Sequence, residues 1–180
     1  SYNSTTFQSR CRFAATYVER YHANPKSFWL AIGKTSPWLD ENNPPLPSIT
    51  VNRLPELYGF YYVHSCLSVV SDSSGLIVTP KQNYKPIIST NYNTLASAKA
   101  NKVYFEALIE PESMGSNFSY RVKGLCTDVQ FNTAPPAEVG PGLFVPASEV
   151  GSYFLDWVSS HTLVENDGVT KQVLQIIREF

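Results

Sequence analysis

Most of this chain alternates between short apolar runs and turns rich in Pro, Gly, Asn and Asp. The runs are rich in aromatic and β-branched residues and too short for most helices, which predicts strands. Asp167-Gly168 stands between the last two runs and is a strong short-range signal for a β-hairpin. The predicted strands cover residues 27–33, 60–72, 102–110, 118–131 (one strand, or two around Gly124), 152–166 and 169–180, and a turn is predicted at residues 111–117.

One helix is predicted, near the N-terminus, over residues 6–23. Thr5 and Gln8 have the spacing of a capping box. Apolar side chains then recur every three or four residues and form a single stripe. Asn24-Pro25 should end the helix, because proline disfavours helical geometry in the residue before it. The stripe consists of Phe7, Cys11, Ala14, Val18 and Tyr21, and is widened by Phe13 and Tyr17.

Two other stretches are not expected to form long regular elements. Residues 35–50 contain four prolines, which favour extended backbone without paired hydrogen bonds. Residues 81–101 are polar and are predicted to form a long loop or a weakly formed element.

The predicted fold class is therefore α+β and mostly β. An N-terminal helix should precede an antiparallel β body that has long Pro-rich loops and a C-terminal β-hairpin. We expect a single domain over residues 1–180, with a subdivision near residues 132–146 as the alternative.

Composition limits the classes of partner that this chain is expected to bind. The formal net charge is −1 and no stretch concentrates Lys or Arg, so we expect no nucleic-acid partner. No apolar run approaches the roughly 18 residues of a membrane-spanning helix, so we expect no membrane partner. Charged residues make up only 16% of the chain, beside 11 Tyr and 10 Phe, which fits a surface covered by neighbouring proteins.

Gly33-Lys34-Thr35 spells the end of a phosphate-binding loop. That motif needs a glycine five residues before Gly33, where this chain has Phe28, and it needs a helix after it, where Pro37 follows. We therefore expect Gly33 to end a strand and Lys34 to begin a surface loop, with no nucleotide or other cofactor bound.

Catalytic chemistry has one weak candidate. His64 and Cys66 should share one face of a strand, so a cysteine hydrolase around Cys66 is an alternative. No glycine-rich elbow lies beside the pair, and a packed strand face is the simpler interpretation. The cysteines, of which there are three, are scattered and odd in number, which favours buried free thiols.

No metal site is predicted. The three histidines lie far apart in the sequence, and no Cys-x-x-Cys pair occurs. Residues 40–43, Asp-Glu-Asn-Asn, lack the alternating ligands and central glycine of a calcium loop, which favours a solvated turn.

The proline-rich stretch is the best candidate for a protein contact. Stiff segments lose little conformational entropy on docking. The alternative is a connection that packs on its own domain. The predicted interface residues are Pro37, Trp38, Pro44, Pro45 and Leu46, with the C-terminal strand pair and Phe180 as a second contact region.

The same stretch resembles the baseplate wedge proteins of contractile-tailed bacteriophages. One such protein has Phe and Tyr in a first helix, then a strand that ends Gly-[Arg/Lys]-[Ser/Thr], then Pro-Trp and a Pro-rich loop with Asn, Asp and Glu. Here the series reads Phe13 … Tyr21, followed by SFWLAIGKTSPWLDENNPPLP. The family also ends in a hydrophobic strand pair that finishes in Phe, as VLQIIREF does at Phe180. The resemblance covers the first third of the chain and the last sixth.

The resemblance implies a virion structural protein without catalysis, assembled in the host cytoplasm into the tail baseplate. It would act through interfaces with other baseplate and tail proteins during tail assembly and contraction, and a homodimer is one arrangement it allows. A carbohydrate-binding or host-recognition module of a phage tail is the alternative. Its sugar-stacking rings would come from Tyr58, Tyr61, Tyr62, Tyr84 and Tyr92.

Overall fold

The computed structural model describes residues 3–111 and 118–180, and the chain divides into two compact units. The first unit comprises the chain up to Pro25, Ser65–Glu106 and Gln175–Phe180. The second comprises Lys26–His64 and Ala107–Leu174. Residues 132–146 lie inside the second unit, and a single domain over the whole chain stays a prediction.

The N-terminal helix of the first unit, α1 (Phe7–Ala23), confirms the predicted span to within one residue. Its N-cap is Thr6, whose side chain accepts a hydrogen bond from the Ser9 amide, so the cap lies one residue later than the Thr5–Gln8 spacing predicts. The helix ends at Asn24, as Asn24-Pro25 predicts. The buried side of the helix consists of Cys11, Ala14 and Ala15, whereas Phe13 is 51% exposed.

The strands of the first unit form around part of β2 (Gly59–Ser71). The end of β2 pairs antiparallel with β4 (Asn83–Pro86), and β4 pairs with the short strand β3 (Ile77–Val78). The strand β5 (Lys102–Ile109) pairs with β2 and with β9 (Gln172–Glu179). Since the division between the units falls inside β2, β5 and β9, these three strands contribute residues to both units.

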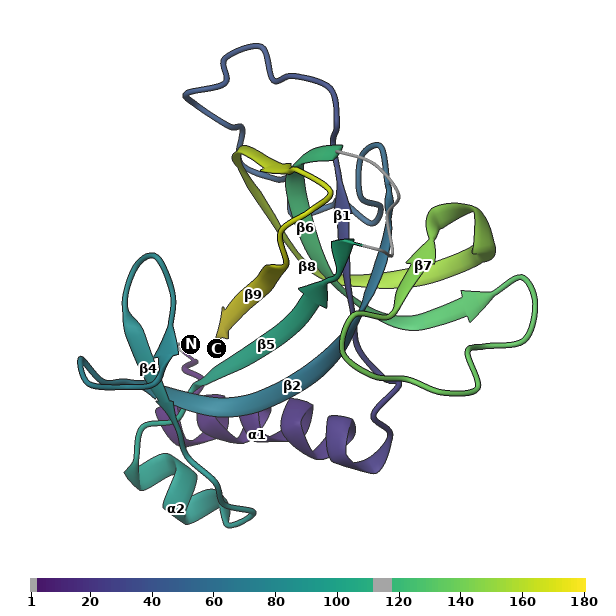
Figure 1. Cartoon of the computed structure of the whole chain (residues 1–180). Coiled ribbons are helices and arrows are strands. Elements are labelled where there is room, and N and C mark those ends of the chain that lie inside the picture. Colours follow the sequence, from purple (N-terminus) through teal and green to yellow (C-terminus); the bar gives the residue numbers. More distant parts are fainter. Residues whose placement is uncertain (1–2, 112–117) are drawn as a thin grey trace. The chain divides into compact units, whose positions relative to one another are not determined.

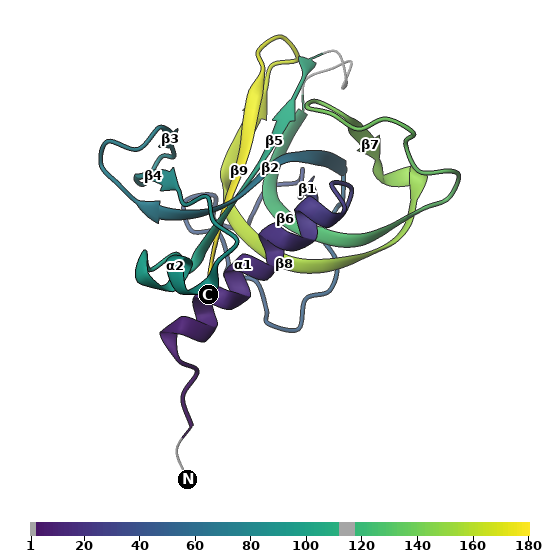
Figure 2. The same ribbon diagram turned by 90° about the horizontal axis from the view of Figure 1, so that it is seen from below.

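Residues 81–101 hold two short elements, β4 and the helix α2 (Tyr92–Ser97). The Asn91 side chain caps α2 by accepting hydrogen bonds from the amides of Asn93 and Thr94. Figure 2 shows α2 beside α1 in the first unit. A small cluster of Ala15, Leu95 and Ala100 packs at this contact, which explains why a polar stretch is ordered here.

The second unit is built around β1 (Trp29–Gly33), all of whose residues are buried. This strand pairs antiparallel with β2 on one side and with β6 (Phe118–Phe131) on the other. The strand β7 (Phe144–Pro146) also pairs with β2, and the 3₁₀ turn η2 (Ala147–Glu149) leads from it into β8 (Val150–Asn166). The core cluster here consists of Trp29, Ala31, Leu54, Phe60, Tyr62, Val122, Cys126 and Val145.

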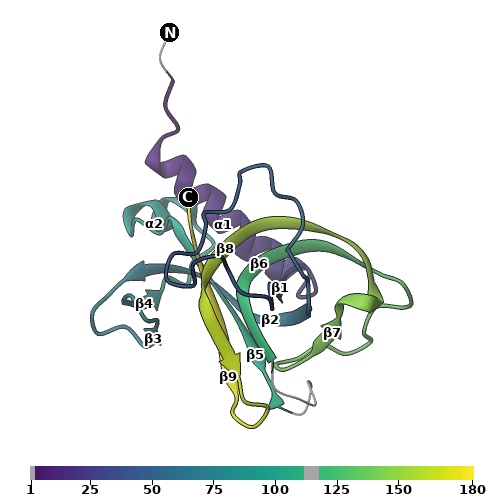
Figure 3. The ribbon, with the colours of Figure 1, turned by 90° about the horizontal axis from the view of Figure 1, so that it is seen from above.

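The strands β6 and β8 form a long antiparallel pair that curves along its length (Figure 3). Residues 118–131 therefore form one strand, with shifts of register instead of a break at Gly124. One shift lies between Tyr120 and Val122, which face Val164 and Ser160, so β8 holds two extra residues there. Such β-bulges bend a strand and increase its twist.

The predicted C-terminal hairpin needs a correction. Strands form on both sides of Asp167-Gly168 as predicted, but β8 pairs with β6 and β9 pairs with β5, and no pairing joins β8 to β9 within the described residues. A two-residue hairpin turn of this type needs left-handed backbone at both positions, and only Gly168 adopts it, with φ of 74°. The Asp167 carboxylate instead accepts hydrogen bonds from the amides of Val169 and Thr170, which spreads the connection over residues 167–171. The turn predicted at residues 111–117 lies, from residue 112 onward, outside the described residues.

Candidate functional site

The site centres on the proline-rich loop, residues 34–53, which leaves the end of β1 and projects from the second unit (Figure 1). No helix or strand forms in it, as the four prolines predict. Its two ends are held together, since the Lys34 amide donates to the Pro55 carbonyl over 2.8 Å. Gly33 permits this approach, because a Cβ atom there would lie 2.5 Å from the same carbonyl oxygen.

A first polar cluster closes the base of the loop. The Lys34 ammonium lies 3.2 Å from the Glu56 carboxylate and donates to the Ser36 hydroxyl over 2.8 Å. Ser36 in turn donates to Glu56 through its hydroxyl and its amide. These hydrogen bonds from Ser36, with the nearby Lys34 charge, lower the pKa of Glu56. The lysine of the phosphate-loop-like string is therefore engaged in the base of its own loop, and an extended chain follows it in place of a helix.

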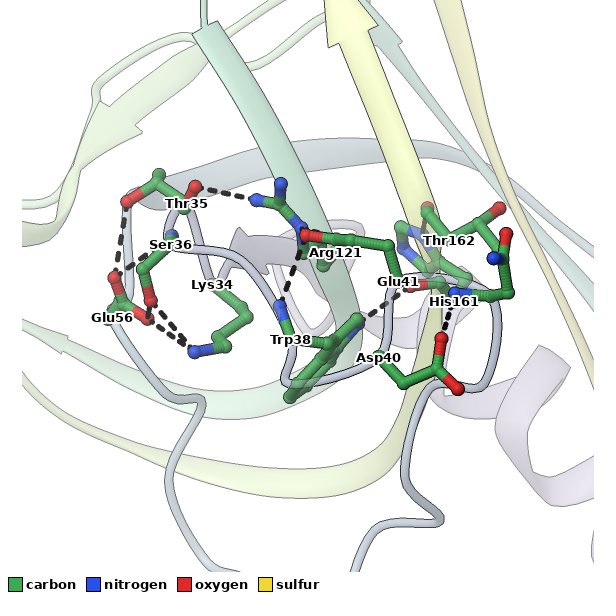
Figure 4. Close-up of polar contacts among 11 residues, drawn as sticks. Lys34, Thr35, Ser36, Trp38, Asp40, Glu41, Glu56, Arg121, His161 and Thr162 are labelled. Atoms are coloured by element: carbon green, nitrogen blue, oxygen red, sulfur yellow. Dashed lines mark hydrogen bonds and ion pairs between the residues drawn. The ribbon is translucent and has the colours of Figure 1, made fainter.

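A second cluster ties the loop to β6 (Figure 4). The Arg121 side chain is only 6% exposed and lies 2.9 Å from the Glu41 carboxylate. Arg121 also donates to the Thr35 carbonyl over 2.6 Å, so one guanidinium joins two points of the loop. Its hydrogen bond lowers the pKa of Glu41. A buried guanidinium needs such partners, because unpaired it would carry a large desolvation cost.

Trp38 is the third attachment. Its indole N–H donates to the His161 carbonyl over 3.1 Å, within the bulge of β8, and its ring packs on the core cluster of the second unit. The Trp38 amide donates to Glu41, and the Lys34 ammonium lies 5.0 Å from the centre of the Trp38 ring. Bulged residues of β8 do not pair with β6, so the indole supplies a partner for one of their carbonyls.

Beyond these attachments the loop turns aliphatic side chains toward solvent. Leu39 is 111% exposed, Leu46 is 95% exposed and Ile49 is 102% exposed. Singly exposed aliphatic residues are ordinary, so the feature to explain is that one anchored loop carries three of them.

The predicted interface residues are distributed between the two units. Pro37, Trp38, Pro44, Pro45 and Leu46 share the proline-rich loop, where Pro37, Pro45 and Leu46 are exposed and Pro44 is partly buried. Phe180 belongs to the first unit. There its ring lies 5.0 Å from that of Tyr17, and the Arg178 guanidinium lies 4.9 Å from its centre.

Sequence reasoning missed four residues of the site, namely Leu39, Ile49, Glu41 and Arg121. A lone arginine in the apolar run FSYRV was a usable signal for a buried ion pair. Nothing local indicated that its partner would be Glu41, because the two residues are eighty positions apart.

Burial counts against the cysteine chemistry and against three of the five tyrosines that were predicted to stack on a sugar. The thiols of Cys66 and Cys126 are buried, and burial raises the pKa of both, which disfavours the reactive thiolate. Tyr61, Tyr62 and Tyr84 are buried and unavailable for stacking on a sugar. In the described part of the chain, no group of three or more His, Cys, Asp or Glu side chains could hold a metal ion.

The Asp40–Asn43 turn has its own hydrogen bonds. The Asp40 carboxylate accepts one from the Asn42 amide, so this acidic stretch forms a turn and Asp40 caps it.

None of the helices in residues 3–111 and 118–180 has the length and apolar character needed to cross a membrane.

Comparison with known families decides what kind of protein this is. A family model described as "Baseplate wedge 3 tail fiber network component" matches residues 5–180. The chain belongs to this family. The match spans α1, the proline-rich loop and the C-terminal strands, and it confirms the resemblance inferred from the sequence. Comparison with curated proteins gives no match.

As a baseplate wedge component, this chain is a structural part of a phage tail baseplate and interacts with other baseplate or tail proteins. The absence of an enzymatic activity, of a nucleic-acid partner and of a membrane partner stays a prediction, as does assembly in the host cytoplasm.

Proposed function

We propose that the proline-rich loop is the surface through which this wedge component binds a neighbouring baseplate or tail protein. The observation that carries the proposal is the contrast within the loop. Its base is held by the buried Arg121 and by Trp38, while Leu39, Leu46 and Ile49 point into solvent.

Prior ordering makes such a loop effective. A segment that is already fixed loses little conformational entropy when it docks. Complete burial of three aliphatic side chains would contribute several kcal/mol, at about 1.5–3 kcal/mol each before the costs of association are subtracted. The loop would then supply the apolar centre of an interface whose rim comes from the polar residues around it.

Trp38 has a positioning role in this proposal. Its ring is half-buried and its N–H is used by His161, so it fixes the loop, while contact of its exposed part with the partner remains part of the proposal. Contact by Pro37, Pro44 and Pro45, and a second contact region at Phe180, remain part of the proposal. Rearrangement of these interfaces would accompany tail contraction.

Complementation of a phage that lacks this gene tests the proposal. We expect the triple variant Leu39→Ser, Leu46→Ser, Ile49→Ser to fold but to be missing from particles, because a docked loop would lose its apolar contacts. The matched control is Leu76→Ser in the first unit, where the leucine is 94% exposed. Normal incorporation of the triple variant, or an equal defect in the control, would count against the loop as the binding surface.

A further inference from the structure

The two units of the chain carry opposite net charges. The first unit has eight Lys and Arg side chains against four Asp and Glu side chains, which is a formal net charge of +4. The second unit has six against eleven, which is −5, so the two nearly cancel to the −1 of the whole chain. A surface of one charge attracts partners of the other. The first unit is therefore expected to favour acidic partners, although the composition of the whole chain gives no sign of this.

Arginines and aromatic rings follow one another along one side of α1. Arg10, Phe13, Tyr17 and Arg20 are separated by steps of three, four and three residues, which places them in a row on the helix surface. Arg10 and Arg20 are exposed, Phe13 is 51% exposed, and Tyr17 is partly buried. The basic character of the first unit is thus combined here with apolar rings that a partner can reach.

The end of β9 continues this row, and Figure 2 shows the C-terminal end of the chain beside α1. The Phe180 ring lies 5.0 Å from the Tyr17 ring, and the Arg178 guanidinium lies 5.4 Å and 4.9 Å from the centres of the Tyr17 and Phe180 rings. Tyr17 also meets Phe105 edge-on, and the Phe180 amide donates to the Asn101 carbonyl over 3.0 Å. Because these contacts already hold the rings in place, a partner that docks on them has little side-chain entropy to remove.

We propose that this surface binds an acidic segment of a neighbouring tail protein, in which Asp or Glu residues stand beside an apolar side chain. Arginine and aromatic residues are enriched in protein interfaces and carry much of the binding energy there. A guanidinium group can bind a carboxylate through two parallel hydrogen bonds, while the rings supply apolar contact area. The surface, which we call the arginine–aromatic surface, consists of Arg10, Phe13, Tyr17, Arg20, Arg178 and Phe180.

The acidic residues next to this surface in the sequence point elsewhere. The Glu19 carboxylate accepts a hydrogen bond from the Tyr92 hydroxyl, so it is engaged on the side of α1 that meets α2. Glu179 follows Arg178 in β9, and successive side chains of a strand point to opposite faces. Since Arg178 faces Tyr17, Glu179 faces away from it. The arginine–aromatic surface therefore keeps its basic character.

Two other occupants would use similar chemistry. Single-stranded nucleic acid also binds arginines and stacked rings. A second copy of this chain would offer its acidic second unit. A different tail protein is favoured over nucleic acid because a baseplate wedge component interacts with baseplate or tail proteins.

This inference rests on the second contact region proposed at Phe180 and adds the chemistry of its partner. The arginine–aromatic surface lies in the first unit and shares no residue with the proline-rich loop, so each can fail while the other holds. A chain that binds one partner by each would join two proteins in the baseplate.

The test is a fluorescence anisotropy titration of the full chain with the labelled peptide Glu-Glu-Leu-Phe-Glu-Glu. We expect saturable binding that weakens as salt is added, because salt screens contacts between exposed charges. The matched peptide Gln-Gln-Leu-Phe-Gln-Gln should bind about tenfold more weakly, as expected when several exposed ion pairs are lost. Equal binding of the two peptides, or no saturable binding of the acidic one, would overturn the proposal.

Exposed positions allow variants that should leave the fold intact. The double variant Arg10→Gln, Arg20→Gln should weaken binding of the acidic peptide about four- to twentyfold. The control Lys81→Gln, Lys85→Gln removes the same charge from exposed positions of the same unit and should leave binding within about twofold. Equal losses in the two double variants would mean that the net charge of the unit, and not this surface, attracts the peptide.

A further variant tests the rings without changing any charge. Phe13→Ser should weaken binding of the acidic peptide about threefold or more, because the apolar side chains of the peptide lose a contact. Unchanged binding would refute the contribution of the rings. The triple variant of the proline-rich loop should bind the peptide as the unaltered chain does, which separates this test from that of the proposed function.

The same titration decides between the occupants. Tighter binding of a labelled oligothymidylate than of the acidic peptide would assign the surface to nucleic acid and overturn the proposal. Self-association in analytical ultracentrifugation that disappears in the Arg10→Gln, Arg20→Gln variant would assign the surface to a second copy, with the same consequence.

Discussion

The second unit contains two proline-rich loops of similar composition. The apolar side chains pack against the core in one loop and face solvent in the other. In the loop of residues 132–143, Val139 and Leu143 pack against the core cluster. Lys26 also donates to the Pro136 carbonyl, which fixes that loop to the start of the unit. In the loop of residues 34–53, Leu39, Leu46 and Ile49 face solvent, while Trp38 packs against the same core cluster.

The difference shows two ways of ordering a chain that cannot form regular structure. One loop closes its own core, so its aliphatic residues stabilise the fold. The other is held at its base by Arg121, Glu41, Lys34 and Glu56, which leaves its aliphatic residues free for a partner. Three experiments test this contrast.

The largest effect is expected when the hydrogen bonds that hold the base of the proline-rich loop, residues 34–53, are removed. Arg121→Met should lower the free energy of unfolding by about 1.5–3 kcal/mol, because charge-assisted hydrogen bonds to Glu41 and Thr35 are lost. Urea unfolding measures the loss, and limited proteolysis should show faster cleavage within residues 34–53. Arg121→Lys should be intermediate, since a lysine cannot reproduce two directed contacts. An unchanged cleavage rate in Arg121→Met would mean that the network does not hold the loop.

A smaller effect should separate the two loops directly. Leu143→Ala should cost about 1–2 kcal/mol in urea unfolding, as expected for a half-buried side chain that leaves a core contact. Leu46→Ala should change the free energy of unfolding by less than about 0.5 kcal/mol, because this side chain is 95% exposed. Equal costs in the two variants would contradict the contrast.

The smallest effect is a pH dependence of proteolysis that is confined to the proline-rich loop, residues 34–53. The pKa values of Glu41 and Glu56 are lowered in the folded chain, mainly by hydrogen bonds from Arg121 and Ser36 respectively. A carboxyl group whose pKa is lowered by folding stabilises the folded chain fully when the pH is above the pKa of that group in the unfolded chain. This stabilisation is lost as the pH falls through the pKa of the group in the folded chain. Proteolysis of the first loop by an acid-active protease should therefore accelerate below about pH 4, and cleavage at residues 132–143 should not. The double variant Glu41→Gln, Glu56→Gln should cleave at a pH-independent rate, and a retained acid transition would assign it to other groups.

Much of the fold could be predicted from short stretches of sequence. The helix ends at Asn24 because Pro25 follows it, and β1 forms because FWLAIG is apolar on both faces. The irregular course of residues 35–50 follows from proline alone. The hairpin at Asp167-Gly168 could not be predicted reliably, because β6 and β5 compete for the strands on either side of it.

The candidate site was predictable only in its location. Pro37-Trp38 marked the loop, and Leu46 was among the predicted contacts. Leu46 faces solvent and Leu143 packs against the core cluster. The difference depends on whether each side chain can reach a core surface, and no local sequence pattern predicts that.

The sequence by itself determined the mostly β class, the helix and its end, the irregular loop and the family resemblance, because each depends on neighbouring residues. Tertiary structure alone decided that Arg121 meets Glu41, that Trp38 meets the bulge of β8, and which leucines face water. These contacts join positions far apart in the chain, and their energies exist only once the sheet has brought both partners together.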